Sequence, residues 1–84
     1  MIPRVSFTQL VTLLVFRDGK EHRAYDVGQA VESSYASIRP SLSALTNMRF
    51  IERLSDGVYS ITARGQDFLI FNGIKDEADV GPQV

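Results

Sequence analysis

The sequence predicts a small, mainly α-helical domain that carries one β-hairpin. Helix-capping signals precede apolar residues spaced three or four apart, and a glycine-containing turn then divides two short apolar segments. A threonine-capped apolar helix follows that hairpin. The chain has 84 residues, 44% of them hydrophobic and 23% charged, which suits one small globular core. We therefore expect a single domain over residues 1–73.

The first helix is predicted to begin at Ser6, because "SFTQ" has the pattern of a capping box. In this motif Ser6 accepts from the N–H of Gln9, and the Gln9 side chain accepts from the N–H of Ser6. Apolar residues then continue to Phe16 and surround the second half of the helix, so several sides of it must be covered. Gly19 is predicted to end this helix.

A polar turn, "DGKEHR", separates the first helix from a short second one, "AYDVGQAVE". In the third helix Ile38, Leu42 and Leu45 recur at helical spacing and are expected to face the core. We expect Ser37 to cap it, since Pro40 is then the third helical residue, whose N–H has no intrahelical partner anyway. A start three residues earlier would place that proline inside the helix at a cost of ~3 kcal/mol.

The segment "FIERLSDGVYSI" is predicted to form the hairpin. A strict two-residue turn would put Ile51 and Ile61 on opposite faces of it. A three-residue turn with Gly57 in a left-handed bulge instead pairs Leu54 with Val58 and brings the two isoleucines together. We expect the second arrangement, because one face of the hairpin then meets the core.

The last helix is predicted over residues 63–72, capped by Thr62 and closed by Gly73. Four apolar residues, 68–71, are consecutive in it, and at about 100° per residue they cannot all face one small core. We therefore expect a homodimer through the first and last helices. The apolar residues assigned to this interface are Val15, Phe16, Ile70 and Phe71.

Charge and composition exclude several classes of function. The net charge is −1, but residues 1–73 carry eight basic and seven acidic side chains, and residues 74–84 are predicted to be an acidic, disordered tail. Without cysteine and with His22 as the one histidine, neither a thiolate nor a paired-imidazole metal site can form. No phosphate-binding loop is present either. The sequence thus predicts a cytoplasmic non-enzyme with no cofactor and no membrane span.

Three segments carry a resemblance to a known family. "LTNMRFIERL" and "YSITARGQDFL" look like the "LxxxGxIxR" and "YxLTxxGxxFL" segments of MarR-type and PadR-type regulators, and "HRAYDVGQAVE" is similar to the second-helix entry of PadR-type proteins. The chain therefore resembles a winged helix-turn-helix domain of three helices, a two-stranded wing and a C-terminal helix. Arg49 replaces the usual glycine after the third helix, which predicts a differently shaped junction, because arginine is a poor residue for positive φ.

The resemblance implies double-stranded DNA as the partner, with the third helix in the major groove and second-helix and wing residues on the backbone. Arg39 has the side chain that can read guanine bidentately. By position, the groove candidates are Ser37, Arg39, Ser41 and Ser43, and the backbone candidates are Arg23, Tyr25 and Arg53. Structural roles remain open for these residues: the serines as small residues in a crowded turn, Tyr25 in the core, Arg53 in an ion pair with Glu52 or Asp56.

Two functions stay open at this point. The first is a sequence-specific DNA-binding transcriptional regulator that acts as a dimer. The second is a protein-protein interaction module, a small adaptor or an inhibitor of a partner complex, that does not bind DNA. The acidic net charge, the acidic Asp56 in the turn and the exposed Ala36 and Pro40 expected on the third helix favour the second.

Overall fold

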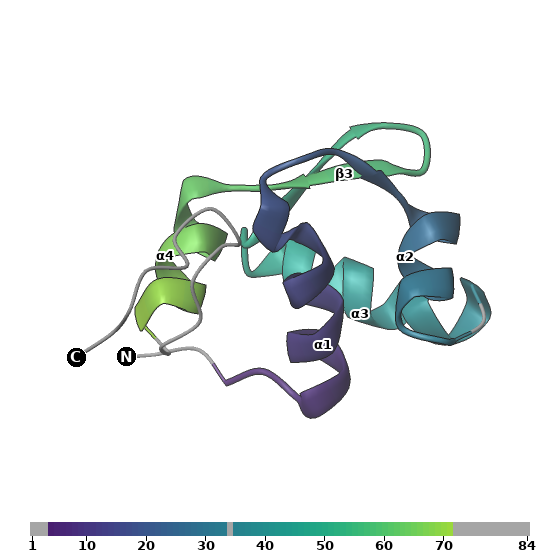
Figure 1. Ribbon diagram of the computed structural model, residues 1–84, viewed down its shortest axis with the longest axis horizontal. Coiled ribbons are helices and arrows are strands. Elements are labelled where there is room, and N and C mark those ends of the chain that lie inside the picture. Colours follow the sequence, from purple (N-terminus) through teal and green to yellow (C-terminus); the bar gives the residue numbers. More distant parts are fainter. Residues whose placement is uncertain (1–3, 34, 72–84) are drawn as a thin grey trace.

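The computed structural model describes residues 4–33 and 35–71, and its arrangement is drawn in Figure 1. Helices α1, α2 and α3 pack together under a small sheet, and α4 lies at one end of the molecule. This is the predicted architecture of helices with one hairpin. The elements in chain order are α1 (Phe7–Val15), the 3₁₀ turn η1 (Phe16–Asp18), β1 (His22–Arg23), α2 (Ala24–Ala30), α3 (Tyr35–Asn47), β2 (Ile51–Ser55), β3 (Val58–Ile61) and α4 (Ala63–Phe71).

The start of α1 is confirmed as a capping box. The N–H of Gln9 donates to the Ser6 hydroxyl at 3.1 Å, and the N–H of Ser6 donates to Oε1 of Gln9 at 3.0 Å. At the other end, η1 tightens the last turn and Gly19 follows it at φ 77°, the left-handed conformation that glycine adopts without strain. The sequence prediction for both ends of this helix therefore holds.

Helices α2 and α3 both end in a Schellman motif whose left-handed residue is not glycine. After α2, the N–H of Ser33 donates to the carbonyl of Gly28 and that of Glu32 to the carbonyl of Gln29, with Glu32 at φ 55°. After α3, the N–H of Phe50 donates to the carbonyl of Leu45 and that of Arg49 to the carbonyl of Thr46, with Arg49 at φ 65°. The expectation of a differently shaped junction at Arg49 is wrong, because these backbone hydrogen bonds hold it in the conformation that glycine usually provides.

The predicted start of α3 is also wrong. The helix begins at Tyr35, so Ser37 lies inside it and Pro40 is its sixth residue, counted from Tyr35 as the first. Pro40 then lacks the N–H that would donate to the carbonyl of Ala36. Both Ala36 and Pro40 are exposed, so water can hydrate that carbonyl and the cost of the missing bond is reduced.

The sheet has three antiparallel strands in the order β1-β3-β2. Ile51 pairs with Ile61 across the hairpin, as predicted, so both lie on the face toward the core. The tip differs from the prediction, because Ser55 rather than Leu54 pairs with Val58 and the register shifts between Arg53 and Ser55. The extra residue thus lies at Leu54 in β2, although the glycine of the turn, at φ 75°, does adopt the expected left-handed conformation.

The third strand lies where the sequence predicted only a polar turn. In β1, His22 pairs with Tyr59 and Arg23 pairs with Val58, and the N–H of Ala24 then donates to the carbonyl of Gly57 at 2.8 Å. A strand of two residues is too short to show an alternating pattern in the sequence. Its pairing fastens the start of α2 to the hairpin.

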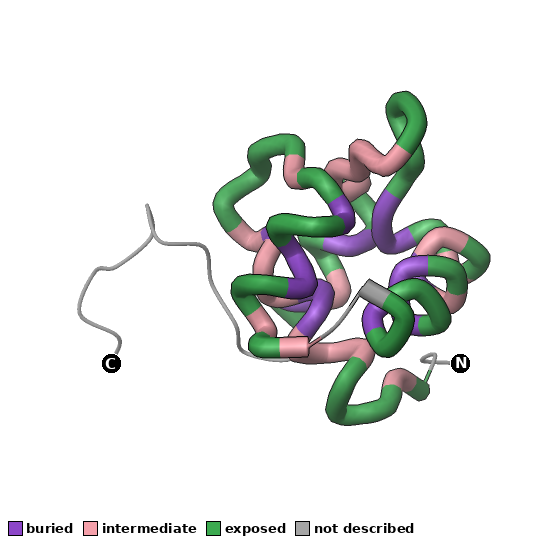
Figure 2. The backbone as a smooth tube through the Cα atoms, turned by 90° about the vertical axis from the view of Figure 1, so that its right-hand side faces the viewer, coloured by how far each residue is buried: buried purple, intermediate pink, exposed green. Residues whose placement is uncertain are grey.

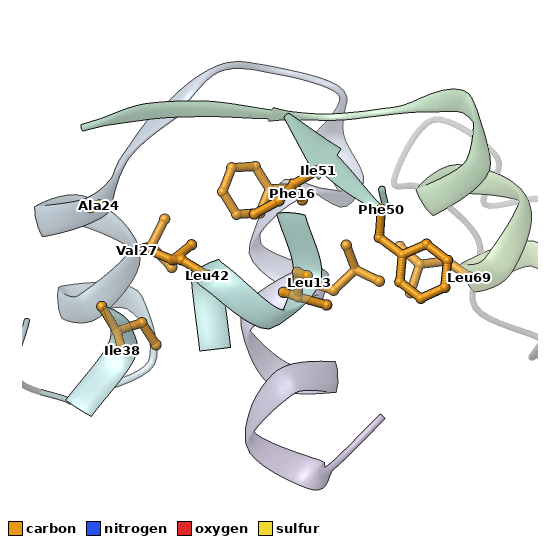
Figure 3. Packing of buried hydrophobic residues seen from close by; sticks show 10 residues of the cluster. Leu13, Phe16, Ala24, Val27, Ile38, Leu42, Phe50, Ile51 and Leu69 are labelled. Atoms are coloured by element: carbon orange, nitrogen blue, oxygen red, sulfur yellow. The ribbon is translucent and has the colours of Figure 1, made fainter. Parts of the chain in front are cut away.

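The core runs between the helices and the inner face of the sheet (Figure 3). The predicted stripe on α3 is confirmed, since Ile38, Leu42 and Leu45 are all buried. Phe16 is completely buried in the same cluster, so its predicted place in a dimer interface is wrong. The remaining members of the cluster are Leu13, Ala24, Val27, Phe50, Ile51 and Leu69.

Thr62 begins α4 as predicted and joins it to the end of α3. Its hydroxyl accepts from the N–H of Gly65 at 3.0 Å and donates to the carbonyl of Arg49 at 2.6 Å. Below this junction the ring of Phe68 stacks on that of Phe50, with centroids 4.5 Å apart. The "YSITARGQDFL" segment therefore carries packing and capping residues rather than chemistry.

Two apolar side chains remain exposed at the end of α4, as expected from its four consecutive apolar residues. Leu69 is buried, whereas Ile70 is 60% and Phe71 is 70% exposed. Within the described residues, no helix is long and apolar enough to cross a membrane. The predicted acidic tail over residues 74–84 and the closing Gly73 lie outside the described residues.

Candidate nucleic-acid interface

The exposed face of α3 carries a polar stripe. Arg39, Ser43 and Asn47 follow at intervals of four residues, so they lie above one another along the helix, and all three are exposed. Ser37 is exposed too, but two residues correspond to about 200° of helical rotation, so it lies on the other flank from Arg39. The stripe therefore contains two of the four side chains predicted for a groove.

Ser41 does not belong to this exposed face. It is only 6% exposed, because it lies three residues after Ile38 and four before Leu45, both of which are buried. Its prediction as a groove residue is therefore corrected. The same helical spacing could have excluded it from the sequence.

A hollow of about 380 Å³ lies between α3 and the hairpin, and we call it the α3–hairpin hollow. It brings Arg39 of α3 and Arg53 of β2 to one depression, although they are fourteen residues apart in sequence. Its lining from α3 consists of Arg39, Leu42, Ser43, Thr46 and Asn47. Its lining from the hairpin consists of Arg53, Asp56, Gly57 and Tyr59.

Arg53 reaches the hollow because of the sheet register. It pairs with Tyr59, two residues from the Ile51 and Ile61 pair, so all four belong to the inner face. The hairpin extends beyond the core, and its residues 52–56, Arg53 among them, are exposed (Figure 2). Arg53 Nη2 donates to Asp56 Oδ1 at 2.8 Å, which is one of the two ion pairs left open by the sequence.

Arg23 and Tyr25 lie outside the α3–hairpin hollow. Arg23 pairs with Val58, so it belongs to the opposite sheet face from Arg53, and its side chain forms an ion pair with Asp26 at 3.2 Å. Tyr25 is 64% exposed at the start of α2, so a core-facing role for it is wrong. The two arginines predicted to contact the DNA backbone therefore lie on opposite faces of the sheet.

Thr46, Asn47 and Tyr59 line the hollow but were not predicted as site residues. The hydroxyl of Thr46 donates to the carbonyl of Leu42 at 2.7 Å, so it is held by its own helix. Asn47 has an amide suited to adenine, and helical spacing from Arg39 could have identified it. Tyr59 lies on the hairpin face of Ile51 and Ile61, and its place in the hollow depends on the packing of α3 against that face.

The charges and donors of the hollow suit an oxyanion or a base edge. Two guanidinium groups, Arg39 and Arg53, and one carboxylate, Asp56, line it, which leaves one formal positive charge in excess. A guanidinium can donate two parallel hydrogen bonds to a phosphate or to the edge of guanine. Within the described residues, no group of three or more His, Asp or Glu side chains is placed to hold a metal ion.

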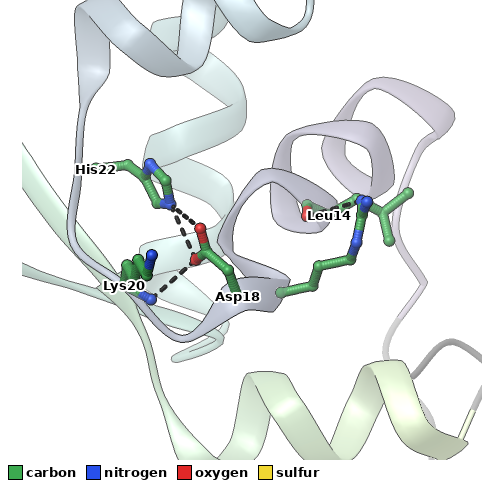
Figure 4. Close-up of polar contacts among 5 residues, drawn as sticks. Leu14, Asp18, Lys20 and His22 are labelled. Atoms are coloured by element: carbon green, nitrogen blue, oxygen red, sulfur yellow. Dashed lines mark hydrogen bonds and ion pairs between the residues drawn. The ribbon is translucent and has the colours of Figure 1, made fainter. Parts of the chain in front are cut away.

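His22 has a structural environment (Figure 4). Its Nε2 lies 3.0 Å from Asp18 Oδ1, and its ring meets that of Phe16 edge to face at 5.3 Å. Burial raises the pKa of Asp18, but the N–H of Lys20, the hydrogen bond with His22 and the charges of both residues outweigh it and lower that pKa below its usual value. This cluster fastens the loop before β1.

Comparison with known proteins gives structural matches only. No protein-family model and no curated protein matches the chain. The crystal structure of AbfR of Staphylococcus epidermidis aligns with a TM-score of 0.71 at 18% identity, over 95% of this chain and 57% of that one. The chain has a winged helix-turn-helix fold. This confirms the fold that the resemblance to MarR-type and PadR-type regulators implied.

Two further AbfR structures give the same result. Reduced AbfR bound to DNA aligns with a TM-score of 0.67 at 19% identity, over 95% of this chain and 61% of that one. Disulfide-formed AbfR aligns with a TM-score of 0.65 at 19% identity, over 75% and 47%. The chain thus spans between 47% and 61% of the length of these AbfR chains.

Proposed function

We propose that this chain is a cytoplasmic, sequence-specific DNA-binding transcriptional regulator. The supporting observation is the α3–hairpin hollow, where Arg39 of the third helix and Arg53 of the wing line one depression. In winged helices this helix enters the major groove while the wing meets the backbone. The similarity in fold to an AbfR structure bound to DNA adds support.

In this proposal the exposed face of α3 reads base edges. Arg39 and Ser43 approach the bases from the stripe, with Ser37 on the other flank of the same helix. Arg53 contacts a phosphate from the hairpin, and Arg23 and Tyr25 contact phosphates from the start of α2, where both are exposed. The buried Ser41 has no role in this interface.

The proposed regulator acts as a homodimer. One protomer offers Arg23, Arg39 and Arg53 to the DNA, which is few for strong binding at physiological salt. Two-fold symmetry doubles this set. The exposed Ile70 and Phe71 supply an apolar surface on α4 for the interface, whereas the buried Phe16 cannot contribute.

Separate substitutions at Arg39 and Arg53 test this proposal in a titration against duplex DNA. Arg39→Ala should weaken binding to a preferred site by ~1 to 3 kcal/mol and relax the preference at one base pair. Arg53→Ala should weaken binding to all sequences about equally and reduce the salt slope by ~0.9. Lys20→Ala is the matched control, because it removes one positive charge from a loop that does not line the hollow.

A protein-protein interaction module is the second candidate. Ala36 and Pro40 are exposed on α3, where they offer no donor to a base edge, and Asp56 already neutralises Arg53. In that case the protein prefers no DNA sequence, and neither arginine substitution changes DNA binding. The same titration distinguishes the two candidates.

A further inference from the structure

The ion pair at the hairpin tip places an acidic side chain in the proposed DNA interface. Arg53 Nη2 lies 2.8 Å from Asp56 Oδ1, and both residues line the α3–hairpin hollow. The Asp56 side chain is fully exposed, at 101%, and the Arg53 side chain is 57% exposed. The carboxylate therefore occupies a donor of Arg53 on the open side of the site.

The shape of the tip makes this pairing possible. The register shift at Leu54 lets Ser55 pair with Val58, so the turn Asp56-Gly57 follows the strand directly. Gly57 takes φ 75°, and a Cβ there would meet nothing within 4 Å. The backbone of the turn thus sets the position of Asp56, and the side chain of Arg53 binds its carboxylate.

A carboxylate and a phosphate are alternative partners for the same guanidinium. An exposed ion pair contributes little to stability, because water and salt screen it, so it can be exchanged. A backbone phosphate offers two non-bridging oxygens, as the carboxylate does, and in a duplex it lies within a dense array of negative charge. The exchange leaves Asp56 beside the incoming phosphate, where the two anions repel each other.

We propose that Asp56 limits the affinity of this protein for DNA by competing with a backbone phosphate for Arg53. This inference rests on the proposed function, and it adds a residue that acts against binding. Asp56 keeps the phosphate contribution small, so that binding depends more on the base contacts of α3. Its removal should raise the affinity for all sequences by about the same factor, because a phosphate contact carries no sequence information.

A double-mutant cycle tests the competition. Duplex DNA of random sequence is titrated at several salt concentrations with the full chain, Asp56→Asn, Arg53→Ala and the double variant, all checked for folding by circular dichroism. We expect Asp56→Asn to bind about twofold to fivefold more tightly and to steepen the salt slope by less than the ~0.9 of one full phosphate contact, because Arg53 already makes part of that contact in the original chain. In the Arg53→Ala background the same change should have a clearly smaller effect.

Glu52→Gln is the matched control, because it changes the net charge equally from the neighbouring position on the opposite face of β2. The competition would be refuted if Asp56→Asn raised the DNA affinity equally with and without Arg53, or if Glu52→Gln raised it as much. Either result would leave only general charge repulsion between the hairpin and DNA. DNA binding with no gain at all from Asp56→Asn would also overturn it while leaving the proposed function in place. If none of the proteins binds DNA, both proposals fail.

Discussion

The start of α4 packs so closely on Phe50 that only glycine fits at position 65. A Cβ on Gly65 would overlap the carbonyl oxygen of Phe50 and lie 2.8 Å from Ile61 Cγ1. The obstacle is backbone, which cannot turn aside as a flexible side chain can. This contact explains why a glycine follows Thr62 after three residues.

Gly65→Ala should therefore destabilise the fold by ~1 to 3 kcal/mol or more, as overpacking does. Urea unfolding followed by circular dichroism measures it. Gly57→Ala is the matched comparison, because a Cβ there meets nothing within 4 Å and only the positive φ opposes it. Its cost should be smaller, ~1 kcal/mol. An equal loss for both variants would contradict the steric account.

The two non-glycine Schellman residues predict stabilising substitutions. Glu32 at φ 55° and Arg49 at φ 65° hold a left-handed conformation that costs an L-residue ~1 kcal/mol. Glu32→Gly should gain most of this, since it also removes a negative charge from a helix C-terminus. Arg49→Gly should gain less, because a cation there is favourable. Thermal unfolding measures both, with Glu21→Gly, an exposed position of ordinary φ, expected to give no gain.

The Asp18 cluster predicts a stability loss in acid. The lowered pKa of Asp18 means that its charged form stabilises the folded state, an effect fully present above the unfolded value of about 3.8. This contribution is lost as the pH falls through the lower pKa of the folded state. The difference in unfolding free energy between the original chain and Asp18→Asn should therefore shrink as the pH falls below about 4. Urea unfolding across a pH series measures it, and a constant difference would refute this role.

The exposed end of α4 predicts a concentration-dependent dimer. Ile70 and Phe71 are 60% and 70% exposed, so replacing both with serine should leave the core intact while weakening association. Sedimentation velocity should show a dimer for the original chain and a monomer for the double variant. Phe7→Ser is a useful comparison, because Phe7 is also exposed, at 80%, but lies at the other end of α1 from Val15. A monomer at high micromolar concentration for the original chain would remove the dimer.

Short sequence patterns were sufficient to predict the structure wherever a helix cap or a buried stripe of apolar residues determines it. The Ser6 and Gln9 box, the Thr62 cap and the pairing of Ile51 with Ile61 follow from hydrogen-bonding groups and from the need to bury one face. Arg39 and Arg53 were also identified as site candidates. That they line one hollow depends on the tertiary packing of α3 against the hairpin, which no short segment encodes.

The wrong predictions from the sequence share a cause. In each of them, tertiary contacts or backbone hydrogen bonds outweighed the local conformational preference of the residues. Pro40 favours a helix start near it, yet α3 begins at Tyr35, since only one exposed hydrogen bond is lost. Arg49 disfavours positive φ, yet the backbone hydrogen bonds around it impose one. The strand at residues 22–23 exists only through its pairing with β3.

Selection from a pool of random duplex DNA, performed at two salt concentrations, decides whether α3 of this protein reads a DNA sequence. We expect an enriched sequence whose binding weakens as salt rises, and a relaxed preference at one base pair of that sequence in the Arg39→Ala variant. Failure to enrich any sequence, with only weak and steeply salt-dependent association, would contradict DNA reading by α3 and favour the protein-interaction module.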